Sequence, residues 1–197
     1  MFGQQFNKGK WMLVIAFLSA IFPNLPANAK DLMNSGKVNP RDTTLVVRKQ
    51  IVAGGTVNIL DGYNSKVKGQ NDFDGNKLTN GRNFVWDAIT INYGVDLTAT
   101  AVESVNYTTA LPAALKSANI VVKQDDEVVR RISISAINDA KSSDERYYYL
   151  DGFGFLQEEL VTAIEIEFAS GTDLAPGAGN SGSVEVIFKG FETAIKR

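Results

Sequence analysis

The stretch VTAIEIEF, residues 161–168, alternates apolar and polar side chains along most of its length. A period of two places three large apolar side chains on one face of an extended strand and Glu165 and Glu167 on the other. This pattern is typical of a half-buried strand, with one face on a core and one in solvent. The stretch therefore predicts an antiparallel sheet rather than a helix.

Strand-like segments continue in both directions from this stretch. They are separated by turns such as Gly54-Gly55, Asp61-Gly62 and Asn80-Gly81, which come too often for long helices. The best helical candidate, residues 110–116, is short. The predicted strands span 43–52, 56–60, 83–93, 118–124, 128–137, 146–150, 161–168 and 183–191. Eight or nine strands without strand–helix alternation predict an all-β, antiparallel β-sandwich of jelly-roll type.

Two predicted strands have distinctive side-chain patterns. In the strand at 128–137, alternation places Ile132, Ile134 and Ala136 on one face. The strand at 83–93 is apolar on both faces over residues 84–86, which predicts a central position. Asp87 interrupts that apolar run. Because a buried carboxylate needs a partner, we expect Asp87 to form a structural ion pair with a residue such as Arg82 or Arg48, either within the subunit or across an interface.

The N-terminal segment has the layout of a secretory signal. Lys8 and Lys10 precede an uncharged apolar run at 11–22, two prolines follow, and Ala27-Asn28-Ala29 offers the small residues that a signal peptidase accepts. The run of 12 residues is shorter than the roughly 20 that span a bilayer. Either the segment is cleaved after Ala29, or it is retained as an arm or anchor.

The sequence thus divides into an apolar N-terminal segment, 1–29, and a single β-sandwich domain, 30–197. If the segment is retained, its large apolar side chains are the candidates for contact with a membrane or a neighbouring subunit. They are Trp11, Leu13, Ile15, Phe17, Leu18 and Phe22.

The composition limits the ligands that the chain can bind and the reactions that it can catalyse. Residues 30–197 carry 18 basic and 22 acidic side chains, so there is no basic field to hold nucleic acid by counterion release. The chain has no cysteine and no histidine. Disulfides, thiol nucleophiles and imidazole catalysis are therefore excluded, and we expect neither enzyme activity nor a cofactor.

Acidic and tyrosine clusters supply the remaining candidates. Asp72, Asp74 and Asn76 resemble part of a calcium loop, but EF-hand spacing would place Gln70 and Gly81 at the first and last ligand positions, which excludes that motif. A solvated turn is favoured, with a surface calcium site as the alternative.

Three consecutive tyrosines, Tyr147, Tyr148 and Tyr149, place aromatic rings on both faces of any strand that holds them. At least one ring must then face solvent or another chain, and such rings serve interfaces well. Tyr63, in the polar loop at 63–77, is a further interface candidate.

The order of the strands resembles a known family. The hairpin 118–123/128–132 with its acidic turn is followed by Tyr149–Phe155, Ala163–Phe168 and Ser183–Thr193, and Gly81–Ile89 precedes them. This succession is similar to that of jelly-roll capsid proteins of tailless icosahedral bacteriophages. The resemblance spans residues 43–193 and rests on pattern rather than on a diagnostic motif.

The resemblance implies a virion subunit that associates with copies of itself and with other capsid proteins. The apolar N-terminus would then be an arm or anchor facing the particle interior, in contact with an internal membrane. An alternative is a secreted bacterial β-sandwich, such as an adhesin, a surface-polymer subunit or a carbohydrate-binding module. A third is a hydrolase whose cleft holds two of Asp72, Asp74, Asp87, Glu165 and Glu167.

Overall fold

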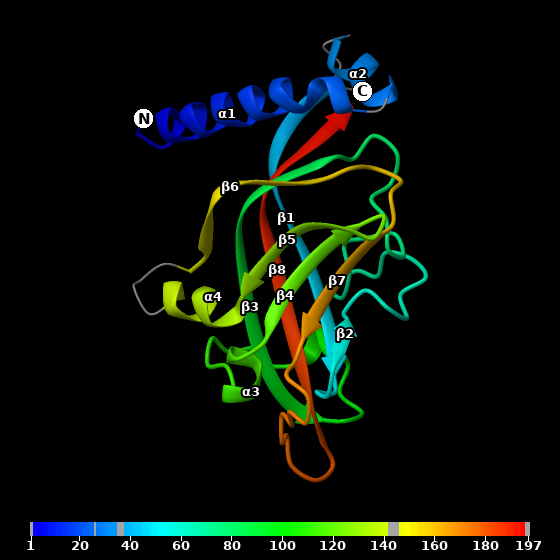
Figure 1. Cartoon of the computed structure of the whole chain (residues 1–197), viewed down its shortest axis with the longest axis vertical. Coiled ribbons are helices and arrows are strands. Elements are labelled where there is room, and N and C mark those ends of the chain that lie inside the picture. The colour runs from blue at the N-terminus through cyan, green and yellow to red at the C-terminus, as the bar shows by residue number, and fades with distance from the viewer. Residues whose placement is uncertain (1, 26, 35–37, 142–145, 196–197) are drawn as a thin grey trace.

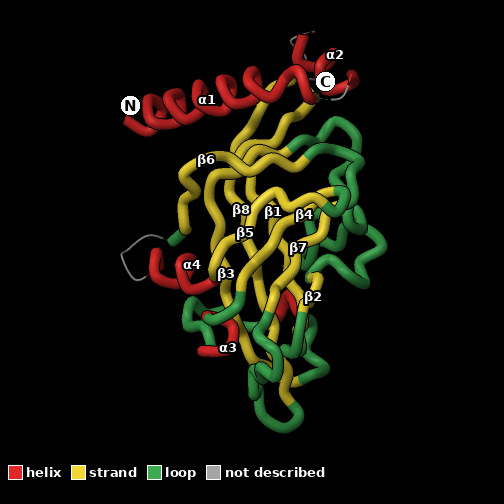
Figure 2. Tube along the Cα trace, viewed as in Figure 1, coloured by secondary structure: helices red, strands yellow, loops and turns green. Residues whose placement is uncertain are grey.

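Two four-stranded antiparallel sheets pack face to face (Figure 1). The computed structural model describes residues 2–25, 27–34, 38–141 and 146–195. The prediction of an all-β antiparallel sandwich is confirmed. Figure 2 shows the two layers of strands, with a long helix lying across one end and loops gathered at the other.

The first sheet has the strand order β1-β8-β3-β6, and the second has the order β2-β7-β4-β5. In chain order, the strands are β1 (Val38–Ile51), β2 (Thr56–Asn58), β3 (Phe84–Leu97), β4 (Asn119–Gln124), β5 (Glu127–Ser133), β6 (Tyr148–Leu156), β7 (Thr162–Glu167) and β8 (Asn180–Ile195). The first strand pairs with the eighth, the second with the seventh, the third with the sixth and the fourth with the fifth. These four pairs are nested in the sequence, and both strands of each pair lie in the same sheet.

The helices lie outside the sandwich or at its ends. They are α1 (Phe2–Ile21), η1 (Phe22–Asn24), α2 (Ala27–Asn34), η2 (Val102–Ser104), α3 (Ala113–Lys116) and α4 (Ile134–Lys141). The expected division between residues 29 and 30 falls inside α2.

Two predicted strands are wrong at one end. The strand expected at 146–150 continues to Leu156 as β6. The segment 128–137 is extended only as far as Ser133, and α4 begins at Ile134. Ile132, Ile134 and Ala136 fit a strand, but Ile134 and Ile137 also fit one face of a helix. In the helix both isoleucines are fully buried, because their spacing of three directs them into the same core. The helix forms here because it buries both isoleucines, whereas the strand pattern would bury only Ile134 of the two.

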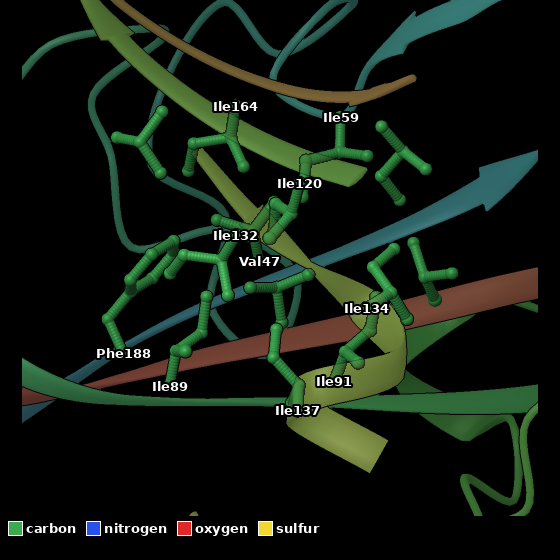
Figure 3. Close-up of a cluster of buried hydrophobic side chains, with 14 of the residues drawn as sticks. Val47, Ile59, Ile89, Ile91, Ile120, Ile132, Ile134, Ile137, Ile164 and Phe188 are labelled. Atoms are coloured by element: carbon green, nitrogen blue, oxygen red, sulfur yellow. The ribbon is translucent and has the colours of Figure 1, made fainter. Parts of the chain in front are cut away.

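The core fills the space between the sheets. Figure 3 shows Ile59, Ile120 and Ile164 facing side chains of the first sheet such as Ile89 and Phe188, and all of these are fully buried. α4 adds Ile134 and Ile137 at the edge of this core, as the same view shows.

Trp86 is the largest fully buried side chain of the core and meets Phe188 edge-on, with ring centroids 4.9 Å apart. Two glycines flank it in register, Gly154 on β6 and Gly190 on β8. A methyl group at Gly154 would overlap the indole ring, and one at Gly190 would overlap the β3 backbone. Both positions therefore require glycine for close approach.

Candidate interaction surface around helix α1

Helix α1 packs on the outer face of the first sheet, at the end where β1 and β8 project (Figure 1). Val14 and Leu18 are buried against Val85 of β3 and Phe191 of β8. Phe17, Ile21, Phe153 and Phe155 complete this second apolar cluster. The rings of Phe17 and Phe153 lie 5.2 Å apart, centroid to centroid. This sheet therefore has apolar contacts on both faces near α1.

The local sequence explains why the sheet needs a cover here. Phe84 and Trp86 point into the main core, so Val85 between them must point outward. The apolar residues on both faces predicted a central strand, and β3 does lie between β8 and β6. What the sequence pattern did not predict is that α1 covers the outer face.

Asp87 lies in a β-bulge beneath α1. Trp86 is opposite Gly190 and Ala88 is opposite Lys189, so Asp87 is the extra residue on β3. Its side chain is largely buried, and its Oδ2 lies 2.5 Å from Nζ of Lys10. The same ammonium group lies 5.1 Å from the centre of the Tyr149 ring. Thus α1 supplies the cation that a desolvated carboxylate requires.

The predicted pairing of Asp87 with Arg82 or Arg48 is wrong. Arg82 forms a bidentate pair with Glu192, with Nε to Oε1 at 2.7 Å and Nη2 to Oε2 at 3.1 Å. Arg48 pairs with Glu185. Arg82 lies in the turn that precedes β3, and its guanidinium is held there by Glu192. The actual partner, Lys10, lies 77 residues away in sequence.

The opposite face of α1 is apolar and exposed. Met12 is 66% exposed, Leu13 61% and Ile15 41%. Of the predicted contact residues, Leu13 and Ile15 are on this face, whereas Phe17 and Leu18 face the sheet and Phe22 is half-buried in η1. The side chain of Trp11 lies outside the described residues. Within the described part of the chain, no helix is long and apolar enough to cross a membrane.

The four candidate tyrosines differ in environment. Tyr148 packs against the main core, and Tyr147 lies under Lys189, whose Nζ is 5.4 Å from its ring centre. Tyr149 is 45% exposed beside α1. Tyr63 donates its hydroxyl hydrogen to the Arg48 carbonyl, and burial, with a smaller contribution from Glu103, raises its pKa. Among them, Tyr149 is the most accessible to another molecule.

A polar cluster covers the lower part of the same outer face. Arg48 and Asn92 both donate to Glu185, and the Arg48 guanidinium lies 5.6 Å from the centre of the Tyr107 ring. Tyr107 donates to the Val102 carbonyl at 2.8 Å, and burial raises its pKa. The loop that carries Tyr107 reaches the sheet because Gly94 has no side chain to block Val105. The sequence analysis did not find this cluster, since its members lie far apart in the chain.

The three candidate calcium ligands, Asp72, Asp74 and Asn76, each interact with a cation or with the backbone. Asp72 accepts from the Val46 amide at 2.9 Å and pairs with Lys66 at 3.0 Å. Asp74 accepts from the Lys66 amide at 3.4 Å, and the Asn76 carbonyl accepts from the Thr162 amide. Among the described residues, no three acidic side chains group as metal ligands would. The loop therefore gives a calcium site no support.

Glu165 pairs with Lys123 at 2.7 Å and Glu167 pairs with Arg131 at 2.9 Å on the outer face of the second sheet. Their outward orientation is as predicted. Asp87 lies on the outer face of the opposite sheet. The five carboxylates considered for a hydrolase are thus distributed over separate surfaces and do not converge on one cleft.

Comparison of the chain with protein-family models, with curated proteins and with solved structures found no match.

Proposed function

We propose that this chain is a structural subunit that self-associates into a bacteriophage capsid shell. The observation that carries the proposal is the docking of α1 on the first sheet. Lys10 neutralises the largely buried Asp87, and Val14 and Leu18 cover Val85 and Phe191. These contacts support a helix that is retained in the working molecule.

The order of the strands supports the fold that this proposal requires. Pairing of the first strand with the eighth, the second with the seventh, the third with the sixth and the fourth with the fifth is what a jelly roll needs. We therefore infer a jelly roll of the type that the capsid resemblance implies, with the virion as its location. A fold hosts many functions, so the order of the strands supports the proposal without carrying it.

The secreted alternative makes the opposite demand on the N-terminus. Its specific support is the small-residue pattern Ala27-Asn28-Ala29. In the folded chain these residues form the start of α2. Cleavage after Ala29 would remove Lys10 and leave Asp87, Val85 and Phe191 uncovered. The contacts of α1 thus favour the capsid subunit.

Assembly needs a surface that meets neighbouring copies, and Tyr149 is our candidate. Its ring is 45% exposed and lies beside Lys10, so a partner contact there would lie on β6, next to the covered side of α1 rather than on its exposed face. Exposed aromatic residues often become the centres of protein interfaces, where truncation to alanine costs about 2 kcal/mol or more.

The test is light scattering and negative-stain electron microscopy of the purified full-length chain. We expect closed particles of uniform size, and we expect Tyr149→Ala to raise the concentration needed for assembly by roughly 30-fold. Val161→Ala is the matched control, because Val161 is 43% exposed but lies beside the β4–β5 turn. A chain that remains monomeric under all conditions would exclude the proposed function.

A further inference from the structure

The two faces of α1 are both apolar, although only one of them is covered. At 100° per residue, Met12, Ala16 and Ala20 form one row, with Leu13 on one side and Ile15 and Ser19 on the other, and all six are exposed. Ser19 is the one polar side chain among them. The covered face carries Val14, Leu18 and Phe17. A surface helix in water normally has a polar face opposite its buried one. From residue 11 to residue 22 this helix has no charged side chain.

Charge distinguishes this end of the molecule from the rest. Residues 1–30 contain three lysines, Lys8, Lys10 and Lys30, and no acidic residue. The remaining chain has 17 basic and 22 acidic side chains, a net charge of −5. The uncovered apolar face therefore lies on a basic segment of an acidic protein.

We infer that the exposed face of α1 binds the surface of an anionic phospholipid bilayer, with the helix axis lying in the membrane plane. This inference rests on the proposed function only in requiring that α1 is retained. Met12, Leu13 and Ile15 enter the boundary between head groups and acyl chains. Because Lys10 is paired with Asp87, the lysines of this segment that can attract lipid phosphates are Lys8 and Lys30.

The packing of α1 fixes its orientation on the bilayer. An isolated interfacial helix needs a polar face toward water, but here the folded domain occupies that side. Lys10 is held by Asp87, and Phe17 is held by Phe153. The helix therefore presents the same side chains to the bilayer that it exposes on the isolated subunit.

A second copy of the chain fits this face less well. A stable protein interface buries roughly 800 Å² on each partner, and three exposed side chains fall short of that area. The other exposed large apolar side chains of the described residues lie away from α1 or, like Tyr149, beside its covered side, and Val52, Val95 and Leu97 lie near one another at the opposite end of the sandwich. A bilayer needs no matching protein patch.

The test is flotation of the full-length protein with vesicles of phosphatidylcholine alone or mixed with phosphatidylglycerol. We expect binding to the mixed vesicles that weakens as salt is raised, and weaker binding to phosphatidylcholine. The variant Met12→Gln/Leu13→Gln/Ile15→Gln keeps good helix formers on the exposed face, and its binding should fall at least tenfold. The matched control, Val52→Gln/Val95→Gln/Leu97→Gln, removes three exposed apolar side chains at the far end and should bind as the parent does.

A second measurement guards against misfolding of the triple variant. Because the chain has no cysteine, Leu13→Cys and Val52→Cys each provide a unique site for an environment-sensitive fluorophore. With vesicles, the label at position 13 should shift to the blue and be quenched by a lipid-borne quencher, whereas the label at position 52 should not change. Equal responses at both positions, or none at position 13, would overturn the inference.

The assembly assay separates this inference from the proposed function. Particles that form normally while neither vesicle type is bound would overturn the membrane inference and leave the capsid proposal standing. Vesicle binding by a chain that never assembles would overturn the capsid proposal and leave the membrane inference standing. If the triple variant alone loses self-association in the absence of lipid and the parent binds no vesicles, the face belongs to a second copy and the inference fails.

Discussion

Asp87 couples a bulge in β3 to the position of α1, a helix far away in the sequence. The bulge gives β3 one residue more than β8 at this point, and the extra side chain is a carboxylate pressed under α1. Oδ1 of Asp87 has no hydrogen-bond partner among the described residues, so Lys10 is its main compensation. A charge in this position favours one placement of α1 over others along the sheet.

Removal of one member of this pair should therefore cost more than removal of both. We expect Lys10→Met to lower the free energy of unfolding by about 1–3 kcal/mol, because it leaves a buried carboxylate uncompensated. The double variant Lys10→Met/Asp87→Leu should recover most of that loss. Equilibrium denaturation of the four proteins in the cycle measures the coupling. Additive losses in the double variant would show that the two side chains do not depend on each other.

The glycines around Trp86 give a second prediction for single residues. Gly154→Ala should destabilise the fold by about 1–3 kcal/mol or more, because the added methyl group overlaps the indole ring. Gly152→Ala is the matched control on the same strand: its methyl group would meet only the Arg130 guanidinium at an ordinary 3.6 Å. That change should stay within about 0.5 kcal/mol. Similar denaturation midpoints for the two variants would refute the close packing at Gly154.

At the scale of single elements, local pattern predicted strands well and failed where two patterns coincided. β7 shows the alternation from which it was predicted, with Ile164 and Ile166 buried and Glu165 and Glu167 outward. The segment after Ser133 fits both periods, and only the shape of the core selects the helix. The docking of α1 depends on contacts with β3, β6 and β8, so no local pattern contains it.

Burial of three tyrosine side chains makes the free energy of unfolding decrease at alkaline pH. Burial raises the pKa of Tyr63, Tyr93 and Tyr107, so these phenols stay protonated in the folded protein at pH values where the unfolded chain ionises, from about pH 10 upward. Because the unfolded state then binds fewer protons, the free energy of unfolding falls as pH rises through this range.

Tyr107→Phe should reduce that dependence. Its stability at pH 8 should drop modestly with loss of the hydrogen bond to Val102, and its decline between pH 9.5 and 11 should be shallower than that of the parent. Denaturant unfolding at a series of pH values provides the comparison. A parallel decline in both proteins would mean that Tyr107 ionises equally in the folded and unfolded states.

At the scale of the whole molecule, the sandwich was predictable and the candidate surface only partly so. Strand periodicity and frequent turns indicate two layers, but the pairing of β1 with β8 joins residues more than 100 positions apart. Leu13 and Ile15 are predicted to contact a membrane or a neighbouring subunit, and both are exposed. Phe17 and Leu18 were expected to do the same and instead hold the helix on its own sheet. The apolar segment is thus divided between an internal and an external role.

The N-terminus of the working protein tests the central claim most directly. Intact mass spectrometry of the protein isolated from its native source, separated by size before analysis, gives the start of the chain in each species. We predict that the chain in large assemblies begins at or next to Met1, with α1 present. A mature chain that begins at Lys30 and migrates as a monomer would contradict the account.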